Sequence, residues 1–145
     1  MLKMLVVVDM QKNFIEEAGA ERMIPRVADK IRWRKREGYE VLLTLDKSGG
    51  DLDGEIAEAC GRARVFEKRS YGSEELVGYL KERGAQRVEF VGICTDICVI
   101  TNVLATITVL PYAEIAVDGG CCAAQTLEGH NCALRIMKSC NIEVN

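Results

Sequence analysis

The 145-residue chain has little of what marks several large classes of protein. It contains two prolines and one histidine, and none of its hydrophobic runs approaches the roughly 18 residues that cross a membrane. Its 19 basic and 22 acidic side chains leave a formal net charge of -3. Proline-rich linkers and collagen-like repeats are therefore excluded, and we expect neither a nucleic-acid nor a membrane partner.

The amino-terminal segment does not have the organisation of an export signal. Residues 1–8 include an apolar run, but Asp9 follows it at once and no small-residue cleavage site comes after it. A buried strand explains the run better than a signal peptide does. We therefore expect a cytoplasmic protein.

The seven cysteines do not form a pattern typical of disulfides or of zinc. Their number is odd, and their spacings are C-x3-C at 94/98 and C-C at 121/122, with His130 as the only histidine. We expect most of them to be small buried hydrophobic residues, and we expect no metal and no cofactor. The cysteines are Cys60, Cys94, Cys98, Cys121, Cys122, Cys132 and Cys140.

Strand-like and helix-like segments alternate along the whole chain. The length corresponds to a single domain, residues 1–145, and the alternation predicts a three-layer α/β/α sandwich with a parallel sheet. The predicted strands are 3–8, 40–45, 65–66, 88–93, 115–117 and 142–144. The predicted helices are 25–37, 54–60, 74–83 and 96–109, followed by one that Thr126 caps and that runs to about Ser139.

Three chemically reactive residues follow predicted strands. Asp9 comes directly after the first strand, Lys68 follows the third, and Cys98 follows the fourth by a short turn. Parallel sheets of this kind bind ligands beyond the carboxyl ends of their strands. Each residue alone has a commoner explanation, as a turn residue, a solvated lysine or a buried cysteine. Their conjunction suggests nucleophilic catalysis.

Cys98 is predicted to lie in the first turn of a helix that Thr95 or Asp96 would cap. The amino terminus of a helix stabilises a thiolate, and its backbone N–H groups can hold a developing oxyanion. Asp9 could accept the thiol proton, while Lys68 could keep Asp9 ionised or polarise the substrate.

Four segments resemble those of the isochorismatase-like cysteine hydrolases, a superfamily that includes nicotinamidases and N-carbamoylsarcosine amidase. Three match its signature segments: V-V-V-D-M-Q-K-N-F (6–14), E-K-R-S-Y-G-S (67–73) and V-G-I-C-T-D-I-C-V-I-T-N (91–102). The fourth resembles nicotinamidase-type members and reads D-G-G-C-C-A-A-Q-T-L-E-G-H (118–130). The resemblance implies a Rossmann-like, six-stranded parallel sheet with helices on both sides.

The same resemblance implies a mechanism. It makes Asp9, Lys68 and Cys98 catalytic, and it assigns an oxyanion hole to the backbone N–H groups of Cys94 and Cys98. It also implies a cis peptide bond between Ile93 and Cys94. The expected reaction cleaves a small amide-type C–N bond through a thioester on Cys98.

The resemblance further places Gln11, Phe14 and Tyr71 near the substrate. Family members are usually oligomeric, so we expect a homo-oligomer, with the apolar stretch 103–112 as a candidate interface. The basic stretch 32–36 around Trp33 is interpreted as a solvated helix face with one aromatic at a subunit contact.

The chain departs from nicotinamidases at their metal site, which has a D-x-H and later H pattern. The matching stretch T-L-D-K-S (44–48) keeps Asp46 but has Ser48 where the first histidine would be. Only 21 residues separate Asp46 from Lys68, and none is a histidine. The segment that lines the pocket therefore looks shortened, and His130 is expected to pack or to cap.

This shortening leaves alternatives open. The first hypothesis is a cysteine hydrolase acting on a small amide-like substrate. The second is a non-catalytic binding or assembly protein that retains the fold with a degenerate active site. A third is a redox protein that uses Cys94 and Cys98.

Overall fold

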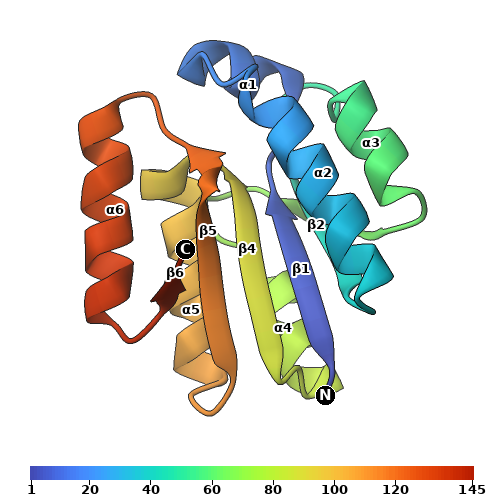
Figure 1. Cartoon of the computed structure of the whole chain (residues 1–145), viewed down its shortest axis with the longest axis vertical. Coiled ribbons are helices and arrows are strands. Elements are labelled where there is room, and N and C mark those ends of the chain that lie inside the picture. Colours follow the sequence, from blue (N-terminus) through green and yellow to red (C-terminus); the bar gives the residue numbers. More distant parts are fainter.

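Six parallel strands form one sheet in the order β3-β2-β1-β4-β5-β6. The computed structural model describes all 145 residues, and its α/β architecture confirms the predicted fold class (Figure 1). The strands are β1 (Lys3–Val8), β2 (Glu40–Asp46), β3 (Arg64–Lys68), β4 (Arg87–Ile93), β5 (Glu114–Ala123) and β6 (Glu143–Val144). The helices are α1 (Lys12–Ala18), α2 (Met23–Arg36), α3 (Gly54–Cys60), α4 (Glu74–Arg83), the π-helical turn η1 (Thr95–Val99), α5 (Ile100–Val109) and α6 (Leu127–Ser139).

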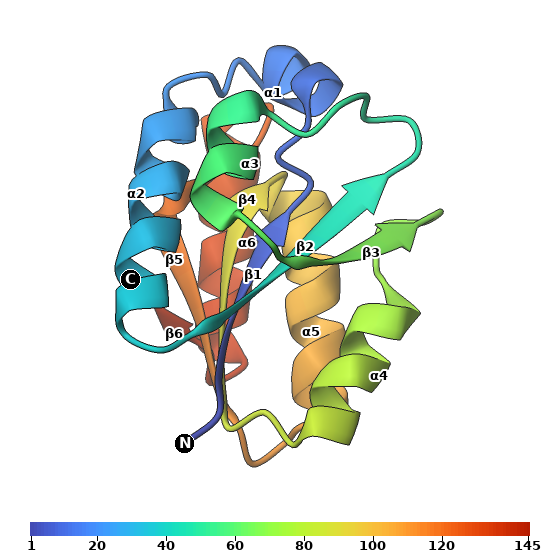
Figure 2. The same ribbon diagram turned by 90° about the vertical axis from the view of Figure 1, so that its right-hand side faces the viewer.

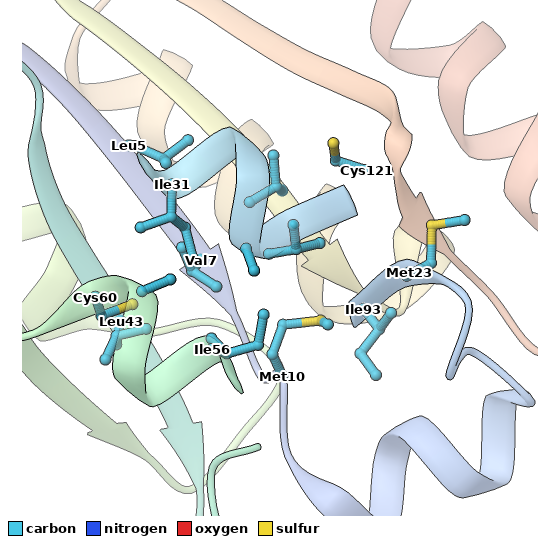
Figure 3. Packing of buried hydrophobic residues seen from close by; sticks show 14 of the residues in the cluster. Leu5, Val7, Met10, Met23, Ile31, Leu43, Ile56, Cys60, Ile93 and Cys121 are labelled. Atoms are coloured by element: carbon cyan, nitrogen blue, oxygen red, sulfur yellow. The ribbon is translucent and has the colours of Figure 1, made fainter. Parts of the chain in front are cut away.

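Helices cover both faces of the sheet and enclose a hydrophobic core on each side. In Figure 2, α2 and α3 lie on one side, and α4 and α5 lie on the other. Residues 4–8 of the central strand β1 are fully buried because both of its faces are covered. Leu5 and Val7 join the core under α2 and α3 (Figure 3), whereas Met4 and Val6 join the opposite core.

One helix, α1, was not predicted from the sequence. It has only seven residues, its N-cap residue Gln11 makes no side-chain cap, and its first turn contains no acidic residue. Ile15 is its one buried side chain, so it has no apolar stripe either. In Figure 1, α1 lies beyond the carboxyl ends of β1 and β4, and it therefore borders the region where ligands are expected.

Strand β5 is longer than predicted. The sequence indicated a strand at 115–117, whereas β5 continues to Ala123. Its pairing with β4 shifts register between Phe90 and Gly92, which leaves residues 118–121 bulged out of the ladder. The two glycines in this bulge are typical of the end of a strand, which explains the shorter prediction. In the structure the pairing of β5 with β4 resumes after them.

The basic stretch 32–36 on α2 is only partly the solvated face that was predicted. Trp33 is half-exposed, and the Arg34 guanidinium lies 4.2 Å from its ring centroid. Arg34 also reaches inward, where its Nε is 2.7 Å from Oε1 of the fully buried Glu89.

None of the helices, α2 included, combines the length and apolar character that crossing a membrane requires.

The close approach of β4 to β1 depends on Gly92, and we predict that Gly92→Ala destabilises the protein. Its φ is +122°, and an added Cβ would overlap the carbonyl oxygen of Val8. Backbone strain and overlap together should lower the free energy of unfolding by about 3 kcal/mol or more. Urea denaturation of the variant and of the wild type measures the difference.

Gly78→Ala is the matched control for this prediction. Gly78 lies in α4, where an added Cβ meets nothing within 4 Å, so alanine should leave stability unchanged or raise it by up to about 1 kcal/mol. An unchanged urea midpoint for Gly92→Ala would show that β1 and β4 tolerate a wider separation here.

Candidate active site

The structure brings Asp9, Lys68 and Cys98 together at the carboxyl edge of the sheet. Lys68 Nζ lies 2.8 Å from Asp9 Oδ2 and 3.4 Å from Cys98 Sγ. Asp9 follows β1, Lys68 is the last residue of β3, and Cys98 lies in η1 after β4. Three segments that are distant in the sequence therefore meet at the carboxyl ends of the strands, where the sequence analysis predicts a site.

The Asp9 carboxylate is held in place from the neighbouring strand. Asp9 is fully buried and has a φ of +48°, a conformation that aspartate adopts more readily than most residues. Thr44 on β2 donates its hydroxyl to Asp9 Oδ1 at 2.8 Å, and the Thr44 carbonyl accepts the Asp9 N–H at 3.1 Å. The other oxygen, Oδ2, faces the Lys68 ammonium and accepts no further hydrogen bond.

Lys68 is a buried cation whose three N–H groups each have an acceptor. In addition to Asp9 and Cys98, its Nζ donates to the Ser70 carbonyl at 3.0 Å. Burial alone would lower the pKa of Lys68, but the hydrogen bond and charge of Asp9 reverse this, and the net shift is upward. Lys68 therefore stays protonated, and its donors are already used within the protein.

The surroundings of Cys98 oppose the predicted stabilisation of its thiolate in the resting protein. Burial and the charge of Asp9 raise the pKa of the thiol to about 12, and Lys68 only partly opposes them. Burial also raises the pKa of Asp9, against the opposing effects of Lys68 and Thr44. The thiol is therefore protonated at rest, and the adjacent carboxylate is a stronger base than an exposed one.

The turn that carries Cys98 begins differently from the prediction. Cys94 is the N-cap of η1, with no side-chain cap, so the predicted capping by Thr95 or Asp96 is wrong. Thr95 instead forms a 2.7 Å hydrogen bond to Nδ1 of His130, which links η1 to α6. Asp96 lies over the first turn of α6, where a Cβ on Gly129 would overlap its Oδ2.

The backbone around Cys94 has a free donor. The Ile93–Cys94 peptide bond is cis, as the resemblance implies. The Cys94 carbonyl accepts from the N–H groups of Ile97 and Val99, whereas the Cys94 N–H donates no hydrogen bond. An unpaired backbone N–H beside the thiol is available to a ligand oxygen.

A cavity of about 170 Å³ opens onto the thiol. It contains Cys98 and Cys94 together with Phe14 and Tyr71, two of the residues expected near the substrate. The complete lining is Phe14, Glu17, Asp46, Ser48, Tyr71, Ile93, Cys94, Ile97, Cys98 and Gln125.

Gln11, the third residue expected near the substrate, does not line this cavity. It is buried, and its amide is fully engaged with backbone atoms: Nε2 donates to the carbonyls of Asp46 and Gly50, and Oε1 accepts from the Asp46 N–H. Gln11 therefore fastens the end of β2 and the loop after it, which supply Asp46 and Ser48 to the cavity wall.

Sequence reasoning did not assign Glu17 and Gln125 to the site. Glu17 lies on α1, the helix without a sequence signal. Gln125 follows β5 and lies within the segment 118–130. The resemblance of this segment to nicotinamidase-type members was the one signal in the sequence that could have assigned Gln125 to the site.

The donor set near Asp46 does not fit a zinc site. Asp46 Oδ1 accepts from the backbone N–H of Ser48 at 2.9 Å and from its hydroxyl at 2.7 Å, while Oδ2 lies 3.7 Å from the Lys68 ammonium. No group of three histidine, cysteine, aspartate or glutamate side chains converges anywhere in the structure. Burial raises the pKa of Asp46, but the bonds from Ser48 and the charge of Lys68 outweigh it, and the net shift is downward.

The fold and this cluster define an α/β protein with a buried aspartate, a buried lysine and a half-buried cysteine at the edge of a parallel sheet. The isochorismatase domain model matches residues 3–145, so the chain belongs to the isochorismatase family, whose members are hydrolases. No curated protein sequence matches the chain.

Solved structures share the fold over nearly the whole chain. The nicotinamidase SaPncA of Staphylococcus aureus is 26% identical, with a TM-score of 0.84 over 99% of this chain and 96% of its own. The zinc complex of Pyrococcus horikoshii pyrazinamidase is 22% identical, with a TM-score of 0.82 over 100% and 99%. The MAR1 ribonuclease of Caenorhabditis elegans is 17% identical, with a TM-score of 0.85 over 98% and 75%.

The position of Asp9 leads to a prediction about thiol reactivity: Asp9→Asn should lower the pKa of Cys98. The substitution removes the negative charge that disfavours the thiolate and leaves the Lys68 ammonium beside it. Each pKa unit by which the thiol falls should raise its alkylation rate about tenfold at neutral pH. Iodoacetamide labelling from about pH 6 to pH 10, followed by mass spectrometry of the Cys98 peptide, measures this rate.

Cys60 is the internal control for this measurement. Burial raises its pKa to about 11, and Lys35 is the charged group that opposes this shift. Its labelling should be the same in both proteins. Slower labelling of Cys98 in Asp9→Asn would mean that Asp9 already holds the thiol proton at rest.

Proposed function

We propose that the protein is a cysteine hydrolase that cleaves the C–N bond of a small amide through a thioester on Cys98. One observation supports this most strongly: Cys98 Sγ, the Lys68 ammonium and the Asp9 carboxylate form one connected cluster, and Cys98 lines a small cavity that is open at its rim. A degenerate site would instead leave these groups apart. The nicotinamidase of Staphylococcus aureus, at 26% identity, supports the same reaction class.

The proposed first step forms the thioester. Asp9 Oδ2 accepts the thiol proton, and the Cys98 sulfur attacks the amide carbon. The carbonyl oxygen becomes an oxyanion, which the N–H groups of Cys94 and Cys98 hold. Collapse of this intermediate breaks the C–N bond, and Asp9 returns its proton to the leaving nitrogen, which departs as ammonia or an amine.

The second step reverses these roles. Asp9 removes a proton from water, the resulting hydroxide attacks the thioester carbon, and the C–S bond breaks. The proton returns to Cys98, and the product leaves as a carboxylic acid. Lys68 remains protonated throughout, because its role is to stabilise the thiolate and to orient Asp9.

The size of the cavity restricts the substrate. Pockets for drug-sized ligands measure roughly 300–1,000 Å³, whereas this cavity has about 170 Å³. We therefore infer that the substrate is a small molecule of about the size of a single ring or a short chain.

The redox hypothesis has less support. All seven cysteines are free, and burial together with Asp96 raises the pKa of Cys94 to about 11. Neither Cys94 nor Cys98 is therefore activated as a thiolate at neutral pH.

The predicted homo-oligomer remains a proposal, and analytical ultracentrifugation would test it by measuring the molar mass of the protein in solution.

Cys98→Ala is expected to abolish turnover. Without the sulfur no thioester forms, so ammonia release from a panel of small amides should fall by a factor of about 1,000 or more. A coupled glutamate dehydrogenase assay measures the ammonia.

Cys140→Ala is the control, because Cys140 is an exposed cysteine at the end of α6. It should retain wild-type activity. Two results would each exclude the proposed reaction. One is ammonia release that continues in Cys98→Ala, and the other is the absence of ammonia release from every amide with the wild-type protein.

A further inference from the structure

The charged residues that line the cavity are all acidic. Of its ten lining residues, only Glu17 and Asp46 are charged. Lys68 lies behind the cavity wall, and its shortest ion pair is with Asp9. Lys68 is close to Asp9 and, at 3.7 Å, to Asp46, while Glu17 adds a further negative charge at the cavity wall, so carboxylates outnumber the ammonium around the thiol.

No lysine or arginine lines the cavity beside these carboxylates. Arg22 and Arg26 line a separate hollow that has only Gln125 in common with the cavity. The field of Glu17 reaches the cavity, because its charge contributes to the raised pKa of Cys94. Asp46 is held in its ionised form by Ser48 and Lys68.

The remaining walls also suit a cation. The rings of Phe14 and Tyr71 both line the cavity, and aromatic faces attract positive groups by cation–π interaction. Tyr71 is exposed at the rim, so a ligand would meet its ring on entry.

From this lining we propose that the site selects small amides that carry a positive charge, with Glu17 and Asp46 as the specificity-determining residues. The proposal rests on the proposed function for its reaction but not for its binding preference. The cationic group would lie against the two carboxylates while the amide carbon lies beside Cys98.

A bound cation would also assist the reaction. The Cys98 thiolate is disfavoured by burial and by Asp9, and only Lys68 opposes them. A second positive charge within the cavity would lower the energy of the thiolate when the substrate is present. Cationic amides should therefore gain in kcat as well as in binding.

A pair of probes with the same shape tests the charge preference. 1-Methylnicotinamide is a cationic aromatic amide, and 3-methylbenzamide is its neutral isostere; 3-carboxybenzamide supplies the anion. Calorimetric titration of the Cys98→Ala protein measures binding without turnover. We expect the cation to bind about tenfold or more tightly than its neutral isostere, and the anion to bind most weakly.

Variants identify the residues responsible. Glu17→Gln should reduce the cation-to-neutral ratio severalfold, and Asp46→Asn should reduce it as well. Glu16→Gln is the matched control, because Glu16 is a neighbouring exposed residue of α1 that does not line the cavity. It should leave the ratio unchanged.

The outcomes separate this inference from the proposed reaction. Equal binding of all three probes, or no binding of any, would overturn the charge preference even if Cys98-dependent hydrolysis is found. Selective cation binding without ammonia release from any amide would support the preference and overturn the reaction. A ratio that both carboxylate variants leave unchanged would overturn the assignment to Glu17 and Asp46.

Discussion

The buried ammonium of Lys68 is the interaction on which the site depends. It is the shared partner of the Asp9 carboxylate, the Cys98 thiol and the Ser70 carbonyl. A buried carboxylate that loses its ion-pair partner becomes an uncompensated charge, typically at a cost of about 3–5 kcal/mol. Loss of the Lys68 ammonium would thus destabilise the folded protein, and its presence orients the proposed base and limits how far burial can raise the pKa of the thiol.

The strand order of the sheet makes this contact possible. β3 and β1 are separated by β2, so the Lys68 side chain must pass the end of β2 to reach Asp9. Thr44 on β2 occupies the intervening position and fixes one carboxylate oxygen, which leaves the other for Lys68. Gly92 lets β4 lie close against β1, and η1 follows β4 with Cys98. The packing of four strands therefore determines the geometry of three side chains.

The sequence predicted those features that depend on local pattern and on strand ends. The buried strands are continuous apolar runs, and the three reactive residues follow them, so both the sheet and the cluster could be inferred. The short helix α1 could not, because its first residues are held by hydrogen bonds to Gly49 and Asp51 in the loop after β2 and not by its own periodicity. The role of Gln11 depends on the loop it fastens, and the protonation of Cys98 depends on burial that only the folded chain creates.

The segment after β2 shows how a small change in donor set alters what a site can recognise. A metal ion at this position would attract an electron-pair donor from the ligand. Here Asp46 Oδ1 accepts two hydrogen bonds from Ser48 and Oδ2 lies 3.7 Å from the Lys68 ammonium, an arrangement that does not provide the ligand set of a metal ion. A carboxylate that binds no metal attracts hydrogen-bond donors and positive groups instead. Asp46 and Glu17 together make this wall of the cavity negatively charged. A ligand is therefore expected to present N–H groups or positive charge here, where a metal ion would require a lone pair.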